Sequence, residues 1–88
     1  MKPLTVRMFG AFRDLEPSGA LQIEIGEDAT VADLRRAFEA QARARWGERF
    51  NPALLAASAF ASEHEVLRSA DHVGGLTEVA VLPPVSGG

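Results

Sequence analysis

With 88 residues, the chain is long enough for one small domain and too short for a second hydrophobic core. Hydrophobic residues make up 47% of it and charged residues 24%, a balance typical of a folded domain and unlike that of a disordered chain. The formal net charge is −3 and the basic residues are scattered, so we do not expect nucleic acid as a partner. The chain has no cysteine, which excludes disulfides, thiolate catalysis and cysteine-bound metals.

Neither a secretory signal nor a membrane span is expected. In the first ten residues, "MKPLTVRMFG", Arg7 interrupts the apolar stretch that a signal peptide would need. The longest nearly apolar stretch, 52–61, is too short to cross a bilayer. We therefore expect a cytoplasmic protein without a membrane partner.

Two stretches near the N-terminus, 4–9 and 20–26, alternate between apolar and polar residues, as half-buried strands do. The residues between them, 10–19, include glycine, proline and serine and predict a turn or a short helical piece. We therefore expect an antiparallel hairpin with a long connection. In the first strand the alternation puts Leu4, Val6 and Met8 on one face and Thr5, Arg7 and Phe9 on the other.

The clearest helix is predicted over 31–46. Thr30 is a good N-cap, and Asp33 can complete a capping box with it. Gly47 is a suitable stop, since glycine is favoured just beyond helix C-termini. The apolar stripe that should face the sheet consists of Val31, Leu34, Phe38, Ala42 and Trp46.

The middle of the chain carries mixed signals. Asn51 and Pro52 mark a helix start, whereas the later aromatic and β-branched residues suit strands. We predict a helical turn near 51–54, a strand near 55–61 and a short strand near 65–68.

A glycine-containing loop then leads to a last strand over 78–82. The element order is therefore β-β-α-β-β-β, an α+β fold with one main helix on one face of a mixed sheet.

We predict a domain over residues 1–82 and an extended tail over 83–88. Pro83 and Pro84 lack the N–H donors that a sheet ladder needs and favour a stiff, extended backbone, which would project the tail roughly 15–19 Å. Gly87 and Gly88 have no Cβ and suit a narrow channel. The tip then offers one reactive group, the α-carboxylate of Gly88, although an idle frayed terminus has the same composition.

A partner-binding patch is predicted on the sheet face that the helix does not cover. The alternation turns Phe9 and Leu82 toward that face, and we group Phe60 with them. The residues expected to face the helix instead are Leu4, Val6, Met8, Val79 and Val81.

Other polar residues are better explained as surface groups than as catalysts. His64 and His72 do not have the spacing of metal ligands, so no metal site is expected. Two carboxylate pairs in predicted turns fit solubility and helix N-terminal charge better than acid–base catalysis. These pairs are Asp14 with Glu16 and Glu27 with Asp28.

Three segments, "VRMFGAFRDL", "TVADLRRAF" and above all the ending "EVAVLPPVSGG", resemble the ubiquitin-like MoaD/ThiS family of sulfur carriers, most closely its molybdopterin synthase small subunits. The resemblance implies a β-grasp fold. It also implies that an E1-like adenylyltransferase uses ATP to adenylate Gly88, which a sulfur donor system then converts to a thiocarboxylate.

By the same resemblance, the tail enters the active site of the large molybdopterin synthase subunit and gives its sulfur to cyclic pyranopterin monophosphate. The isolated domain would bind no cofactor and would not be an enzyme alone. The residues implied to thread the partner are the stem Pro83, Pro84, Val85 and Ser86 and the tip Gly87 and Gly88.

Three other functions remain open at this point. One is sulfur delivery to another pathway, such as thiamine or cysteine biosynthesis. A second is a ubiquitin-like modifier joined to lysines of other proteins, and the third is a binding domain with an inert tail. Because Lys2 is the only lysine, polymers linked through internal lysines are not expected.

Overall fold

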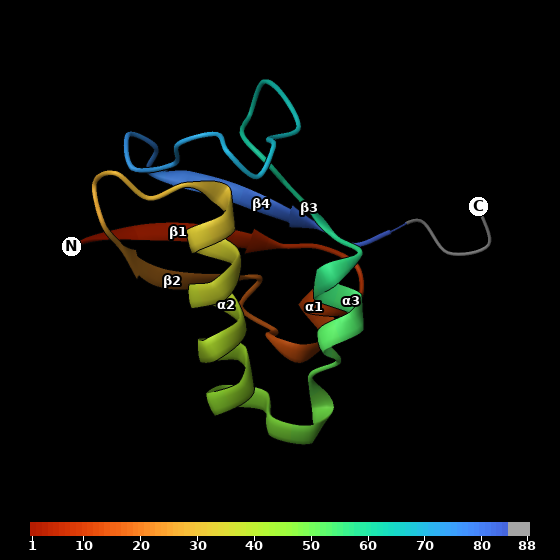
Figure 1. Ribbon diagram of the computed structural model, residues 1–88. Coiled ribbons are helices and arrows are strands. Elements are labelled where there is room, and N and C mark those ends of the chain that lie inside the picture. The colour runs from red at the N-terminus through yellow and green to blue at the C-terminus, as the bar shows by residue number, and fades with distance from the viewer. Residues whose placement is uncertain (85–88) are drawn as a thin grey trace.

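The computed structural model describes residues 1–84, in which a four-stranded sheet carries one long helix across one face (Figure 1). None of the helices in this part of the chain is long and apolar enough to cross a membrane. The elements are β1 (Lys2–Met8), α1 (Ala11–Leu15), β2 (Ala20–Ile25), α2 (Val31–Trp46), the 3₁₀ turn η1 (Gly47–Arg49), α3 (Pro52–Ala56), β3 (Ala59–Ala61) and β4 (Glu78–Leu82).

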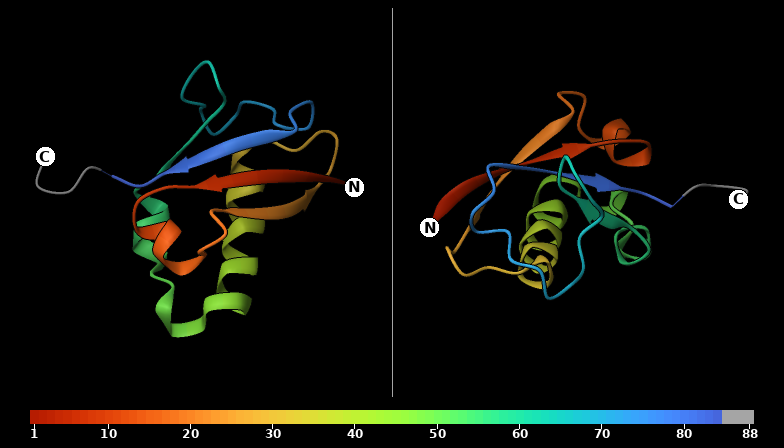
Figure 2. Two further views of the ribbon diagram at one scale, coloured as in Figure 1. Left: turned by 180° about the vertical axis from the view of Figure 1, so that it is seen from behind. Right: turned by 90° about the horizontal axis from the view of Figure 1, so that it is seen from above.

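The strands lie in the order β2-β1-β4-β3, so the first and last strands are neighbours at the centre of the sheet. β1 pairs antiparallel with β2 and parallel with β4, while β3 pairs antiparallel with β4. The expected hairpin, mixed sheet and α+β class are therefore confirmed. In two further views α2 lies on one side of the sheet and the strands form the opposite side (Figure 2).

Helix α2 begins and ends where the sequence predicts, and its capping box is present. The Thr30 hydroxyl accepts a hydrogen bond from the Asp33 N–H (3.3 Å), and the Asp33 carboxylate accepts one from the Thr30 N–H (3.0 Å). At the other end Gly47 has φ +54°, a conformation that side chains disfavour, and it ends the helix. These caps satisfy backbone groups that an uncapped helix would leave exposed.

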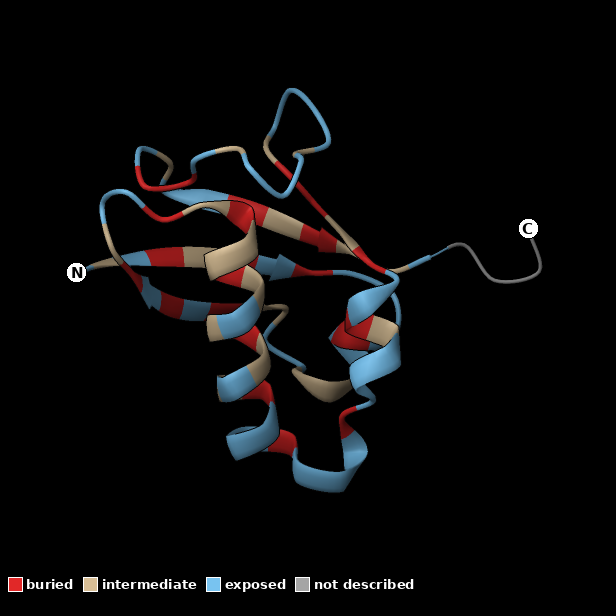
Figure 3. Ribbon diagram, viewed as in Figure 1, coloured by how far each residue is buried: buried red, intermediate tan, exposed pale blue. Residues whose placement is uncertain are grey.

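The predicted apolar stripe of α2 is buried and forms the centre of the core (Figure 3). The ring of Phe38 meets three other aromatic rings edge-on, at centroid distances of 5.8 Å for Phe12, 6.1 Å for Trp46 and 6.1 Å for Phe60. Such edge-to-face packing stabilises a core beyond simple burial. Contacts with Phe38 therefore connect α1, the C-terminal end of α2 and β3 in the core.

The middle of the chain differs from the prediction in three ways. Helix α3 extends to Ala56 because Asn51 caps it and helix-forming residues follow, so β3 is only three residues long and starts at Ala59. No strand forms over 65–68, where the only pairing is one bridge between Ala61 and Val66. The tight turn at Ser62–Glu65 leaves Val66 61% exposed. Residues this exposed make too few packing contacts to support a fifth strand.

The assignment of Phe60 to the outer patch is wrong. Its side chain is fully buried and lies on the helix-facing side of the sheet. The physical reason is register, because Phe60 stands opposite Val81, and directly paired residues point to the same face. The residues that do face the helix as predicted are Leu4, Val6, Met8, Val79 and Val81, all of them buried.

Candidate functional site

The candidate tail leaves the fold from the end of a central strand. In β4, Val81 stands opposite Met8 on one side and Phe60 on the other, and Leu82 is the last paired residue. Pro83 is partly buried and Pro84 is exposed. Because neither proline has an N–H to donate, the ladder stops at Leu82, as predicted. The remaining predicted tail residues, Val85, Ser86, Gly87 and Gly88, lie outside the described residues.

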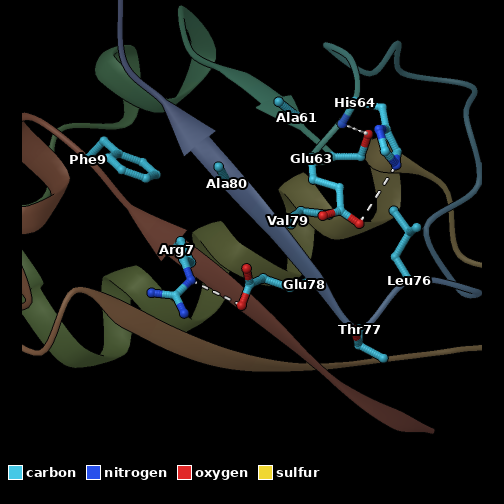
Figure 4. A pocket seen from close by; sticks show the side chains of 11 residues that line it. Arg7, Phe9, Ala61, Glu63, His64, Leu76, Thr77, Glu78, Val79 and Ala80 are labelled. Carbon is cyan, nitrogen blue, oxygen red and sulfur yellow. Dashed lines mark hydrogen bonds and ion pairs between the residues drawn. The ribbon is translucent and has the colours of Figure 1, made fainter.

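The side of the sheet that α2 does not cover carries a hollow of about 460 Å³ (Figure 4). Its floor is formed by outward-facing residues of β1 and β4. Its walls are formed by residues 61–64, which begin at the end of β3, and by residues 76–77, just before β4. Apolar and charged groups alternate around it. The lining includes Arg7, Phe9, Ala61, Glu63, His64, Leu76, Glu78 and Ala80.

Charges of both signs are placed side by side in this hollow. The Arg7 Nε lies 3.0 Å from a Glu78 carboxylate oxygen, across the parallel pair of β1 and β4. Both side chains are about half exposed, so solvent screens the pair and its contribution to stability is small. On the opposite wall the His64 Nε2 lies 3.8 Å from a Glu63 oxygen. The hollow therefore presents polar groups beside its apolar residues.

Phe9 and Leu82, unlike Phe60, lie where the sequence predicts. Phe9 follows β1 directly, is 44% exposed and lines the hollow. Leu82 is partly buried and pairs with Ala59 on the outer face. Continuing the register beyond Met8 and Val81 puts Phe9 beside Leu82. Two of the three predicted patch residues thus share one face near the end of β4.

Sequence reasoning missed the polar part of this surface. Arg7 was placed on the outer face by alternation, but nothing local indicated that Glu78 would lie beside it. In the parallel pair of β1 and β4, Glu78 stands opposite Thr5 and Arg7 opposite Ala80, so Arg7 reaches Glu78 diagonally on the same face, and only the register of these distant strands brings the two charges together. Leu76 was missed because it lies in the loop before β4, where no periodicity applies.

The only lysine holds this loop in place. The Lys2 Nζ donates hydrogen bonds to the carbonyl oxygens of Gly74 (2.5 Å) and Leu76 (3.0 Å). Gly74 itself is buried against the 26–29 turn, where a Cβ would come within 1.8 Å of the Glu27 carbonyl oxygen. The position of Leu76 at the edge of the hollow therefore depends on the N-terminal residue pair Lys2 and Pro3 being in the sheet.

The predicted carboxylate pairs do not converge on a common site. Glu16 accepts hydrogen bonds from Ser18 (2.8 Å) and Arg45 (3.0 Å), and these, Ser18 first, hold the pKa of its carboxyl below the ordinary value. Asp14 is exposed on α1. Glu27 and Asp28 lie in the exposed turn before α2, where Asp28 contributes its backbone oxygen, not its carboxylate, to a contact with His72.

The histidines occupy separate environments. His64 lines the hollow, while the Nδ1 of His72 lies 3.1 Å from the Asp28 carbonyl oxygen. Within residues 1–84 there is no group of three or more His, Asp or Glu residues able to hold a metal ion.

Comparison with a family model matches residues 6–88 to the ThiS family. Comparison with curated proteins finds no match. The family match includes the tail as well as the folded part of the chain.

Three solved structures from Haloferax volcanii have the same fold. SAMP1 is 23% identical with a TM-score of 0.71, covering 99% of this chain and 100% of its own. A second structure, described as small archaeal modifier protein 1, is 18% identical with a TM-score of 0.69, covering 97% and 100%. The solution structure of the HVO 2177 protein is 24% identical with a TM-score of 0.57, covering 98% and 86%. At these identities the likeness concerns the fold.

Proposed function

This chain belongs to the ThiS family of ubiquitin-like β-grasp proteins, and on that premise we propose that it is a sulfur carrier whose reacting group is the carboxylate of Gly88. In the proposed cycle an adenylating partner joins this carboxylate to AMP, using ATP and releasing pyrophosphate. A sulfur donor then displaces AMP and leaves a thiocarboxylate. The acceptor that we propose is cyclic pyranopterin monophosphate, in the synthesis of molybdopterin.

The observation that carries the proposal is the way the chain leaves the sheet. β4 is a central strand held on both sides, and the two prolines after it end the pairing abruptly. Pro84, the last described residue, is exposed. The ending Pro-Pro-Val-Ser-Gly-Gly resembles that of the molybdopterin branch of the family, which supports the proposed acceptor. We propose that the partner reaches the carboxylate of Gly88 without unfolding of the domain.

The domain itself contributes no catalytic group to this cycle. A carboxylate is a poor electrophile until it is converted to a mixed anhydride, and that step needs the nucleotide site of the partner. We therefore propose that the adenylyltransferase and the large synthase subunit supply the catalytic residues. The outer sheet face, with Phe9, Leu82 and the hollow beside them, is the surface that we propose they bind.

A second function, conjugation to other proteins, is favoured by one observation. Two of the similar structures are of SAMP1, which one of their descriptions calls a small archaeal modifier protein. The same adenylated glycine would then be attacked by a lysine amine instead of a sulfur nucleophile. The two functions share activation and differ in the final acceptor, so one experiment can separate them.

The test is intact-mass analysis of the chain, tagged only at its N-terminus and purified from its native host. A carrier should show a fraction in which one oxygen is replaced by sulfur, and that fraction should transfer sulfur to the pterin substrate in the presence of the large subunit. Deleting Gly88, or adding one residue after it, should abolish the species while thermal unfolding is unchanged. Lysine-linked adducts on other proteins, without the thiocarboxylate, would instead establish the modifier.

The proposed binding face is tested by Phe9→Lys. The variant should weaken binding to the adenylating partner, measured by titration calorimetry, because it places a solvated charge in an apolar contact. The matched control is Val66→Lys, since Val66 is an exposed apolar residue that does not line the hollow. Equal loss of binding in both variants would argue against the sheet face.

A further inference from the structure

Pro83, the first residue of the predicted tail, lies against Gly10. β1 and β4 run parallel and end at the same edge of the sheet, with Met8 opposite Val81. Two residues further along each strand, the bare Cα of Gly10 faces the ring of Pro83. A Cβ built on Gly10 would lie 2.8 Å from the Pro83 Cγ and 3.8 Å from its Cδ. The ring therefore occupies the space that any side chain at position 10 would need.

Gly10 is itself held firmly. Its backbone has φ +57° and ψ −131°, a region open to glycine and strained for other residues. Its carbonyl accepts a hydrogen bond from the Arg13 N–H (3.0 Å), which fixes Gly10 to the start of α1. α1 in turn is anchored by Phe12, which is fully buried against Phe38. The surface that Pro83 meets is thus continuous with the core.

Pro83 is suited to a contact of this kind. It cannot extend the ladder, and its ring fixes φ, so packing of the ring determines the direction of the next peptide bond. Pro83 is partly buried and Pro84 is exposed, so the contact with Gly10 lies where the chain leaves the folded surface.

We infer that Gly10 is a positioning residue, a seat for the Pro83 ring that sets the direction in which the tail leaves the sheet. The consequence for activity rests on the proposed function. A partner that holds the sheet face receives the tail as a tethered group, and a directed root raises the effective concentration of the carboxylate at the partner's active site. Loss of the seat should therefore lower kcat for activation while KM, set by the sheet face, is retained.

The chain offers a closely matched control. Gly47 has φ +54° and ψ −127°, nearly the backbone of Gly10, yet a Cβ there meets nothing within 4 Å. Gly10→Ala and Gly47→Ala thus impose the same backbone strain, and only Gly10→Ala displaces Pro83. Both variants should unfold at lowered temperatures, Gly10→Ala at the lower of the two because it also displaces the Pro83 ring. Only Gly10→Ala should lower kcat, by about tenfold, a loss comparable to the backbone entropy of ordering one residue.

The assay is ATP–pyrophosphate exchange with the host's adenylating enzyme, combined with NMR of the free chain. In the wild type a nuclear Overhauser effect should connect the Gly10 Hα to the Pro83 ring, and it should persist in Gly47→Ala and vanish in Gly10→Ala. Pro83→Ala, which removes Cγ and Cδ without backbone strain, should lower kcat by itself. Adding Gly10→Ala to it should lower kcat little further.

The outcomes separate the two proposals. A wild-type chain that no adenylating enzyme activates would overturn the proposed function. The NMR contact alone would then test whether the Pro83 ring packs on Gly10. Absence of the wild-type contact would overturn the seat. With an active wild type, equal kcat values in Gly10→Ala and Gly47→Ala would also overturn it. If Gly10→Ala does not fold, an unchanged kcat in Pro83→Ala would overturn it instead.

Discussion

Two phenylalanines that look alike in the sequence should respond very differently to truncation. Phe60 is fully buried and its ring packs edge-on against Phe38, whereas Phe9 is 44% exposed beside the hollow. We predict that Phe60→Ala severely destabilises the domain and that Phe9→Ala does not. The pair also tests how β3 and β4 are paired, because a shift of their register by one residue would turn Phe60 toward the outer face.

The magnitudes follow from burial. Replacing a fully buried phenylalanine by alanine costs about 3–5 kcal/mol, since the lost apolar contact and the cavity both contribute. Slightly more than half of the Phe9 surface is buried, so Phe9→Ala should cost about 1–1.5 kcal/mol. A chain of 88 residues has a total stability of about 4–13 kcal/mol. Phe60→Ala should therefore remove a large share of it, while Phe9→Ala lowers the melting temperature by about 4–12 °C.

The assay is urea unfolding followed by circular dichroism, with the free energy of unfolding extrapolated to water. Both variants should keep the wild-type slope if they fold to the same state. A loss near 1 kcal/mol for Phe60→Ala would contradict the core position of Phe60 and the register with it. A loss above about 3 kcal/mol for Phe9→Ala would place Phe9 in the core and remove it from the proposed binding face.

Three further predictions test the capping box of α2, the hydrogen bonds of Lys2 and the packing of Gly74. Hydrogen bonds from Thr30, the one from its backbone N–H first, hold the pKa of Asp33 below its usual 3.8. The ionised Asp33 carboxylate therefore stabilises the fold above pH 3.8. This contribution is lost as the pH falls through the lower pKa of the folded state. Asp33→Asn should weaken the pH dependence of the free energy of unfolding at acid pH, and adding Thr30→Ala should change that dependence little further. An unchanged pH dependence in Asp33→Asn would refute the capping box. Lys2→Met should cost about 1–3 kcal/mol in urea unfolding by removing both hydrogen bonds to the loop, and equal stability would show that the loop holds itself. Gly74→Ala should cost more than about 3 kcal/mol because the atom that a Cβ would meet belongs to the backbone. Gly75→Ala has open space and no positive φ, so it should be neutral or stabilising by about 0.4–1 kcal/mol. Similar thermal shifts in the two variants would contradict the packing of Gly74 on Glu27.

Features fixed by short-range chemistry could be predicted from the sequence. The limits of α2 follow from Thr30, Asp33 and Gly47, which act within one or two helical turns. The faces of β1 and β2 follow from strict alternation, and the end of β4 follows from the missing donors of two prolines. In each case the residues that determine the structure lie beside the residues that adopt it.

Features that depend on distant pairing could not be predicted. Whether Phe60 faces inward depends on its partner Val81, which lies 21 positions later in the sequence. The Arg7–Glu78 pair requires knowing that the first and last strands are parallel neighbours. Residues 65–68 have the composition of a strand, but the tight turn after Ser62 leaves them only one bridge. The hollow was missed for the same reason, since its walls come from three separate segments.

Strand β4 links the proposed binding face to the proposed reacting end. Glu78 and Ala80 line the hollow, and Pro83 meets Gly10 where the strand ends. At about 3.3 Å per residue, Glu78 and Pro83 are about 17 Å apart along one extended backbone. Because this strand is paired on both sides, that distance cannot vary without breaking the sheet. A partner that holds the hollow therefore also fixes the point at which the chain leaves the sheet.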